Sequence, residues 1–121
     1  MSNHISNPWE HLVKATAISV GGLRAAFRHE EAFRQEVLVL LIVIPTGLWL
    51  GNTGAERALL IGSWVLVIVV ELVNSAIESV IDRIGLERNE LAGRAKDLGS
   101  AAVFCAIMLA IAVWVVVLAT P

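Results

Sequence analysis

The sequence contains few charged residues and almost no cysteine. Charged residues make up 17% of the 121 residues, whereas about 25% is usual in a soluble domain. The net charge of -2 offers no basis for neutralising nucleic-acid phosphates, so we expect no nucleic-acid partner. The single cysteine, Cys105, excludes an intrachain disulfide and a zinc site built from cysteine. The sequence also contains neither a Walker-type phosphate loop nor the signature of a soluble protein kinase.

Apolar residues, in contrast, are abundant. They make up 57% of the chain and gather in long runs between short charged segments. About 20 such residues are needed to cross the hydrocarbon core of a bilayer, and residues 98–119 form a run without any charge. Two shorter runs reach spanning length when neighbouring polar residues are included. We therefore predict one all-α membrane domain over residues 1–121, with spanning helices at 31–50, 56–84 and 94–119.

The predicted spans are joined by two different connections. Residues 51–54, rich in glycine, are typical of a tight turn. A longer polar segment, residues 82–97, joins the second span to the third, with Gly85 and Gly93 as predicted helix breaks. Pro45 lies within the first span, where we expect it to kink the helix or to be accommodated by neighbouring helices.

The N-terminal segment predicts a further helix over residues 8–28. Its apolar stripe includes Trp9 and Phe27 beside basic residues, which is typical of an amphipathic helix at the membrane surface; packing on another protein helix is the alternative. Nearly all Lys and Arg residues precede the first span or lie between the second and third, whereas Arg57 falls on the other side. Because cytoplasmic flanks retain Lys and Arg, we predict a bacterial inner-membrane protein with a cytoplasmic N-terminus and a periplasmic C-terminus.

A polar stripe interrupts the second span. Its members, spaced by three and four residues and thus on one helical face, are Glu71, Asn74, Ser75, Glu78 and Asp82. A charge at the centre of a membrane helix costs about 2.5–3.5 kcal/mol, so such residues need partners or a use. Carboxylates can hold Mg²⁺ or accept a proton from a hydroxyl group, and basic residues can bind phosphate. The stripe and the basic segment after it therefore favour phosphoryl transfer.

Structural roles are the alternative for the two glutamates of this stripe. Glu71 and Glu78 could pair with arginines and hold the bundle together. The candidate partners are Arg34, Arg83 and Arg94. A small proton-coupled transporter would also place acids inside a helical bundle, although its acids would lie deeper in the membrane.

Other polar residues near the stripe have similar alternatives. Asn74 and Ser75 could form hydrogen bonds between helices. Lys96 could be a cation that only sets the topology, and Asp97 could cap the third span.

Four segments of the chain resemble the prokaryotic diacylglycerol kinase family. They are GLRAAF at 22–27, EAFRQE at 31–36, ELVNSAIESVIDRIG at 71–85 and GRAKDLGSAAV at 93–103. The resemblance covers nearly the whole chain and implies a kinase that uses ATP and Mg²⁺ to phosphorylate the hydroxyl group of a membrane lipid. It also implies a homotrimeric bundle with active sites shared between copies. Diacylglycerol is the leading substrate, with phosphatidic acid as product, and undecaprenol is the alternative within the family.

The resemblance also implies roles for individual residues. Glu78 matches the general base and, with Glu30, the metal-binding positions. The implied catalytic residues are Glu78, Asn74, Asp97 and Lys96, the substrate-binding residues are Glu71, Ser19, Glu36 and Ser100, and the nucleotide-binding residues are Lys96, Asp97, Glu87 and Glu30. The chain departs from the best-known family pattern at His11, Val20, Gly21, Arg88 and Asn89. Nucleotide affinity and lipid preference are therefore the properties that the resemblance determines least.

Overall fold

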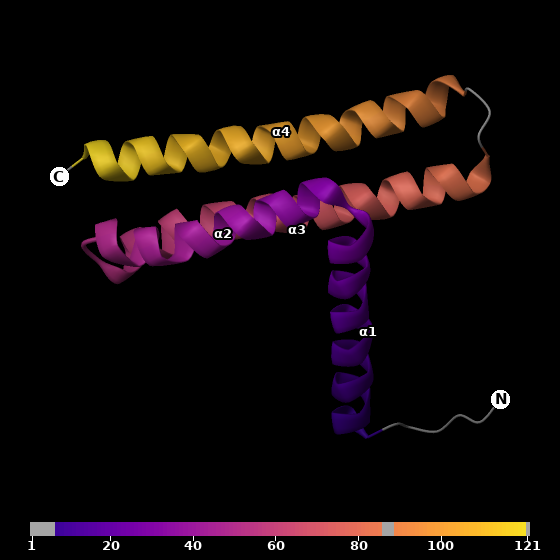
Figure 1. Ribbon diagram of the computed structural model, residues 1–121, viewed down its shortest axis with the longest axis horizontal. Helices are drawn as coiled ribbons and strands as arrows, with labels where there is room; N and C mark the ends of the chain where they lie inside the picture. The colour runs from indigo at the N-terminus through magenta and orange to yellow at the C-terminus, as the bar shows by residue number, and fades with distance from the viewer. Residues whose placement is uncertain (1–6, 86–88, 121) are drawn as a thin grey trace.

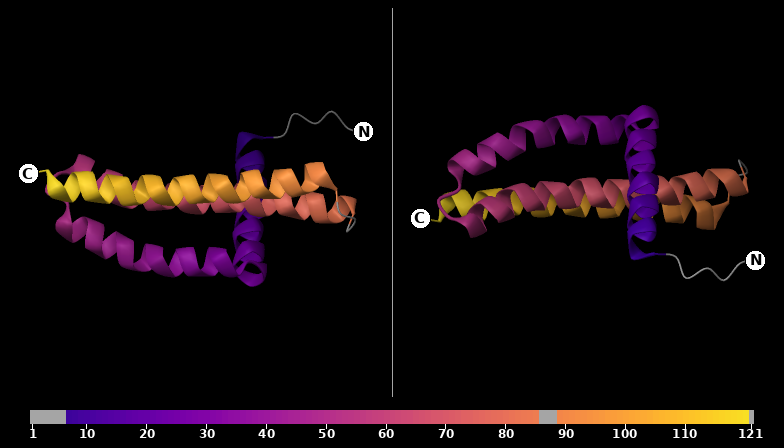
Figure 2. Two further views of the ribbon diagram at one scale, coloured as in Figure 1. Left: turned by 90° about the horizontal axis from the view of Figure 1, so that it is seen from above. Right: turned by 90° about the horizontal axis from the view of Figure 1, so that it is seen from below.

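The chain folds into helices joined by short connections. The computed structural model describes residues 7–85 and 89–120, which contain α1 (Pro8–His29), α2 (Glu31–Leu50), α3 (Gly54–Ile84) and α4 (Glu90–Ala119) (Figure 1). α2 and α4 both pack along α3, whereas α1 stands across the bundle (Figure 2). α2, α3 and α4 are each long and apolar enough to cross a membrane. The predicted all-α class, with three such helices and a separate N-terminal helix, is confirmed.

Local hydrogen bonds set both ends of α1. The Asn7 side chain accepts a hydrogen bond from the Trp9 backbone N–H (3.1 Å) and caps the first turn. At the other end, Arg34 Nη1 of α2 donates to the carbonyl oxygens of Phe27 (2.8 Å) and Arg28 (3.1 Å). The arginine thereby holds the corner between α1 and α2. This corner allows α1 to lie along a membrane surface that α2 enters.

A tight turn joins α2 to α3, as the glycines at 51–54 predicted. The Thr53 hydroxyl accepts from the Glu56 N–H (3.1 Å), and the Glu56 carboxylate accepts from the Thr53 N–H (3.1 Å). This capping box starts α3 at Gly54, slightly before the predicted boundary. Pro45 lies inside α2 without ending the helix, which continues to Leu50.

Two small hydrophobic cores hold the bundle along α3. The first joins α1, α2 and α3, and the second joins α3 and α4. Their buried members are Ala26, Phe33 and Ile68 in the first core and Val67, Ala106 and Ala110 in the second. The alanines of α4 allow its backbone to approach α3 closely, as small residues commonly do between membrane helices.

The predicted connection between α3 and α4 needs a correction. The break at Gly85 is confirmed, because α3 ends immediately before it. The break at Gly93 is wrong, because α4 begins at Glu90 and continues through that glycine. The Asn89 side chain accepts from two N–H groups of the first turn (2.9 and 3.2 Å), and this cap starts the helix early. Most of the predicted polar connection, residues 82–97, is therefore helical.

Candidate active site

The polar stripe of α3 forms the centre of the candidate site. Glu71 is buried, and Asn74 and Glu78 are half-buried. Asn74 Nδ2 donates a long hydrogen bond to Glu78 Oε1 (3.4 Å), and the amide also interacts with the Glu71 carboxylate. A single amide thus lies between two carboxylates, one helical turn from each of them. Within the described residues Asn74 bonds inside its own helix, and its hydrogen bond to another helix stays a prediction.

Two further carboxylates approach the stripe from outside α3. Glu36 of α2 is buried, and its charge and that of Glu71 repel each other. Glu30 is the residue between α1 and α2. Its backbone is extended, and its side chain does not cap α2. The charges of Glu30 and Glu78 both act on Glu71. We call Glu30, Glu36, Glu71 and Glu78 the carboxylate cluster. Such a concentration of negative charge favours binding of a cation.

α4 contributes a positive charge beside this cluster. Lys96 Nζ lies 2.8 Å from Asp82 Oδ1 of α3, and its charge also interacts with Glu78. Both members of the ion pair are largely exposed, with side chains 45% and 58% accessible. Exposed pairs contribute only about 0–1 kcal/mol to stability. A phosphate group can therefore compete with Asp82 for the lysine at little cost.

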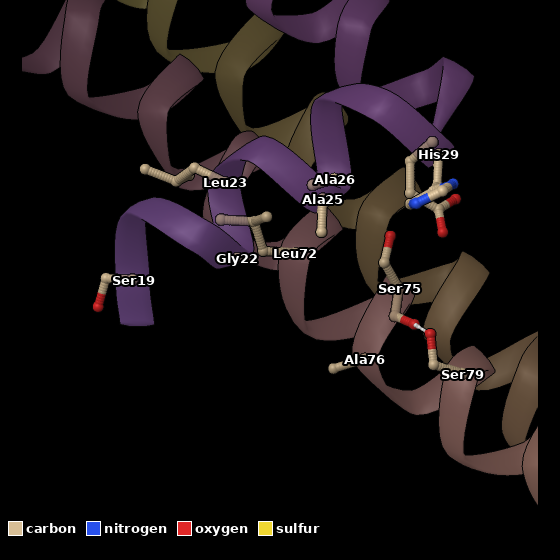
Figure 3. Close-up of a pocket in the computed structure, with 11 residues that line it drawn as sticks. Ser19, Gly22, Leu23, Ala25, Ala26, His29, Leu72, Ser75, Ala76 and Ser79 are labelled. Carbon is tan, nitrogen blue, oxygen red and sulfur yellow. Dashed lines mark hydrogen bonds between the residues drawn. The ribbon is translucent and has the colours of Figure 1, made fainter. Parts of the chain in front are cut away.

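A pocket of about 570 Å³ lies between the C-terminal half of α1 and α3 (Figure 3). Small side chains line most of it, together with the polar residues Ser19, His29, Glu30 and Ser75. Ser75 and His29 lie at one end of the pocket, and Ser19 lies at the other. Because Glu30 belongs to both the pocket and the carboxylate cluster, a molecule in this pocket would lie beside the cluster.

The structure does not support the alternative in which arginines neutralise the α3 glutamates. Arg34 caps α1, and Arg94 lies 3.9 Å from Glu90, one turn earlier in α4. No ion pair within residues 7–85 and 89–120 includes Glu71 or Glu78. The predicted pairs are therefore absent from the described residues, and Arg34 and Arg94 instead find partners close to them in sequence.

The remaining predicted residues are placed less centrally. Asp97 lies in the second turn of α4, so its predicted role as a helix cap is wrong. Asp97 and Ser100 are both exposed on α4. Glu87 and Arg88 lie outside the described residues.

The donor groups suit a cation that arrives with a ligand. In the described part of the chain, no group of three or more His, Cys, Asp or Glu residues is placed to hold a metal ion by itself. Mg²⁺ commonly takes only one or two carboxylates and fills its other positions with phosphate oxygens and water. Glu30 and Glu78, whose charges both interact with that of Glu71, offer such a pair of carboxylates.

Sequence reasoning missed two contacts between α3 and α4. One is the pairing of Lys96 with Asp82. The other is the burial of Gly99 against Asn74, where a methyl group on the glycine would overlap Asn74 Oδ1. Helical spacing indicates which residues share a face of one helix, but it does not give the register between two helices. Gly99, in the segment GRAKDLGS, was the only signal of these contacts in the sequence.

Comparisons with known proteins find one family and several similar relatives. A family model described as "Prokaryotic diacylglycerol kinase" matches residues 17–118. The chain is 51% identical to the diacylglycerol kinase of Haemophilus influenzae over 104 residues, which cover 86% of this chain and 88% of the relative. It is 48% identical to the diacylglycerol kinase of Escherichia coli K12 over 118 residues (98% and 96%). It is 45% identical to that of Pseudomonas aeruginosa over 109 residues (90% and 89%).

Proposed function

The chain belongs to the prokaryotic diacylglycerol kinase family, and from this membership we propose that it transfers the terminal phosphate of ATP to the free hydroxyl group of diacylglycerol in a membrane. The product is phosphatidic acid. The observation that carries the proposal beyond the family is the position of the pocket between α1 and α3, which opens beside the carboxylate cluster. A lipid headgroup and a phosphate donor can meet at such a place.

The pocket suits a lipid because of the helix that forms one of its walls. Trp9, Leu12, Val13 and Phe27 of α1 expose large apolar surfaces, and α1 stands across the three long apolar helices (Figure 1). A helix of this kind lies in the membrane interface, at the depth of the lipid headgroups. The hydroxyl group of the substrate would then lie near Glu30 and Ser75, with Ser19 at the other end of the pocket, while its acyl chains extend into the bilayer.

Glu78 is the general base in this proposal. It is half-buried, and its carboxylate accepts a hydrogen bond from Asn74. This hydrogen bond holds the carboxylate in one orientation. General acid–base catalysis requires a group within hydrogen-bond reach of the proton that moves, and hydrogen bonds at such sites are often long before the substrate binds. Glu78 takes the proton of the lipid hydroxyl as the hydroxyl oxygen attacks the terminal phosphorus of ATP, and the bond from that phosphorus to the bridging oxygen breaks to release ADP. Glu71, buried two turns away on the same face of α3, contributes to the lipid site.

ATP binds on the side of the cluster formed by α3 and α4. Lys96 exchanges Asp82 for a phosphate oxygen, a charge-assisted contact stronger than the exposed ion pair that it replaces. Glu30 and Glu78 would hold Mg²⁺, which would supply positive charge to neutralise the transferred phosphate. Asp97, Ser100, Glu36 and Glu87 are further candidates for the walls of the site by family resemblance.

The protein lies in the inner membrane as a homotrimer with shared active sites. The distribution of basic residues supports a cytoplasmic N-terminus and a periplasmic C-terminus, so the carboxylate cluster faces cytoplasmic ATP. Each long helix exposes large apolar side chains that can face lipid or another copy, among them Leu41 of α2, Val73 of α3 and Phe104 of α4.

A kinase assay on a panel of lipids tests the proposal. The purified protein is incubated in detergent with ATP, Mg²⁺ and either diacylglycerol or undecaprenol, and the phosphorylated lipid is identified. We expect phosphatidic acid to be the main product. Phosphorylation of undecaprenol alone would assign the protein to the other lipid alcohol. Transfer to neither lipid would contradict a lipid kinase. Substrate flux through vesicles without ATP consumption would support a transporter instead.

A further inference from the structure

α4 lies close to α3 at Asn74, the residue that donates a hydrogen bond to the proposed base. Gly99 of α4 is buried against the Asn74 side chain. A methyl group on Gly99 would overlap Asn74 Oδ1 and would lie 3.1 Å from Cγ and 3.8 Å from Cβ of the same residue. Asn74 Oδ1 is itself buried and accepts no hydrogen bond from the described residues. The amide therefore turns its oxygen toward the glycine and its nitrogen toward Glu78.

This close approach is not a general property of the glycines in the long helices. A methyl group on Gly62 of α3 or on Gly93 of α4 would meet nothing within 4 Å. A methyl group on Gly47 of α2 would meet Ile61 at 3.0 Å, which is a tight contact between apolar groups. Within the described part of the chain, Gly99 is the helical glycine whose missing side chain leaves room for a polar group of the candidate site.

We propose that Gly99 is a positioning residue that acts through Asn74 to orient the carboxylate of Glu78. The space beside the glycine holds the amide oxygen, so that Nδ2 points at Glu78 Oε1. If the amide were reversed, its oxygen would face the negative carboxylate, and like partial charges would repel. The inference rests on the proposed function, in which Glu78 is the general base, and adds a residue that touches neither substrate nor nucleotide.

The consequence of filling this space follows from which atoms would move. The overlapping atom is at the end of the Asn74 side chain, whereas the backbones of α3 and α4 are not in conflict. In Gly99→Ala the amide should therefore swing away, the bundle should remain folded, and the hydrogen bond to Glu78 should be lost. Hydrogen bonds to charged groups contribute about 1.5–3 kcal/mol, which corresponds to a fall of roughly 10- to 100-fold in kcat. KM for ATP and for diacylglycerol should change little.

The test compares Gly99→Ala with the matched variant Gly62→Ala, which adds the same methyl group to open space. Asn74→Ala and the double variant with Gly99→Ala complete the set. We expect Gly62→Ala to keep kcat, Gly99→Ala to lose it, and the double variant to be no slower than Asn74→Ala alone. The side-chain amide resonance of Asn74 should shift in Gly99→Ala and stay in place in Gly62→Ala.

Three outcomes would overturn the inference. They are equal kcat in the two glycine variants, a double variant slower than Asn74→Ala, and a fall in the unfolding midpoint of Gly99→Ala that matches its loss of activity. The last result would make Gly99 a packing residue. Failure of the proposed function is recognised separately, because the unsubstituted protein would then phosphorylate neither lipid, or Glu78→Gln would remain active.

Discussion

The two halves of α3 differ in whether the polar groups around them have hydrogen-bond partners. In the N-terminal half, Trp114 Nε1 donates to the Leu60 carbonyl (2.9 Å) and Ser63 Oγ donates to the same oxygen (3.2 Å). Trp64 Nε1 donates across the bundle to the Glu36 carbonyl (2.9 Å). Leu60 itself is completely buried. The polar atoms of these side chains are satisfied by the protein's own backbone.

The C-terminal half of α3, together with Glu36 of α2 beside it, leaves polar groups without partners. Glu36 Oε2 and Asn74 Oδ1 are buried and unbonded within the described residues, and Glu36 lies close enough to Glu71 for their charges to repel. Buried polar atoms are usually hydrogen-bonded, and exceptions inside membrane helices commonly mark functional sites. The contrast indicates that one half of α3 is arranged for stability and the other half for a ligand. Substitutions in the two halves should therefore have different effects.

The largest expected effect is that of Glu78→Gln in the C-terminal half. The substitution keeps the shape of the side chain but removes the proposed base and one negative charge from the metal site. General-base catalysis contributes about 10²–10⁴-fold, so kcat for phosphorylation of diacylglycerol should fall by that factor. The unfolding midpoint should not decrease.

Glu56→Gln in the first turn of α3 is the matched control, since Glu56 caps the helix far from the cluster. It should keep its activity. A folded Glu78→Gln variant that retains most of its turnover would remove Glu78 from the mechanism and would make the contrast between the two halves purely structural.

Much of this contrast could be predicted from the sequence, because it depends on spacing within one helix. The alternation of three and four residues placed Glu71, Asn74 and Glu78 on one face, and their position in an apolar span indicated a use. The helix boundaries were harder to predict from the sequence. The caps formed by Thr53 and Asn89 start α3 and α4 before the predicted residues. Capping depends on a few local hydrogen bonds, which apolar periodicity does not report.

Contacts between helices could not be predicted in the same way. Nothing in the spacing of α4 indicates that Lys96 reaches Asp82, that Gly99 faces Asn74, or that the arginines bond elsewhere. These contacts depend on the relative rotation and translation of two packed helices. That register is set by side-chain fit along the whole interface.

At Glu36 we expect a smaller loss of activity together with a gain in the stability of the fold. Glu36→Gln removes one of two neighbouring buried carboxylates, so the folded protein should become more stable while its activity declines. Burial of an ionised carboxylate and repulsion from a like charge both disfavour the folded state, so removing them should raise the stability by about 0.5–2 kcal/mol. The midpoint of unfolding in mixed detergent micelles measures the change.

Glu31→Gln on the same helix is the control for this measurement, because Glu31 is exposed. Its stability should change by no more than about 0.5 kcal/mol. A decrease in stability for Glu36→Gln would show that the buried carboxylate supports the fold, and the C-terminal half of α3 would then resemble the N-terminal half.

The smallest effect is expected for Trp114→Phe, in the half arranged for stability. Phenylalanine keeps most of the apolar contact but removes the indole N–H that donates to the Leu60 carbonyl. Hydrogen bonds between membrane helices contribute about 0.6 kcal/mol on average, so the unfolding equilibrium should shift only about threefold toward the unfolded state. Lipid kinase activity per folded molecule should be unchanged, because Trp114 lies outside the carboxylate cluster. A loss of turnover without a loss of stability would show that the two halves of α3 are coupled, and the division between them would have to be abandoned.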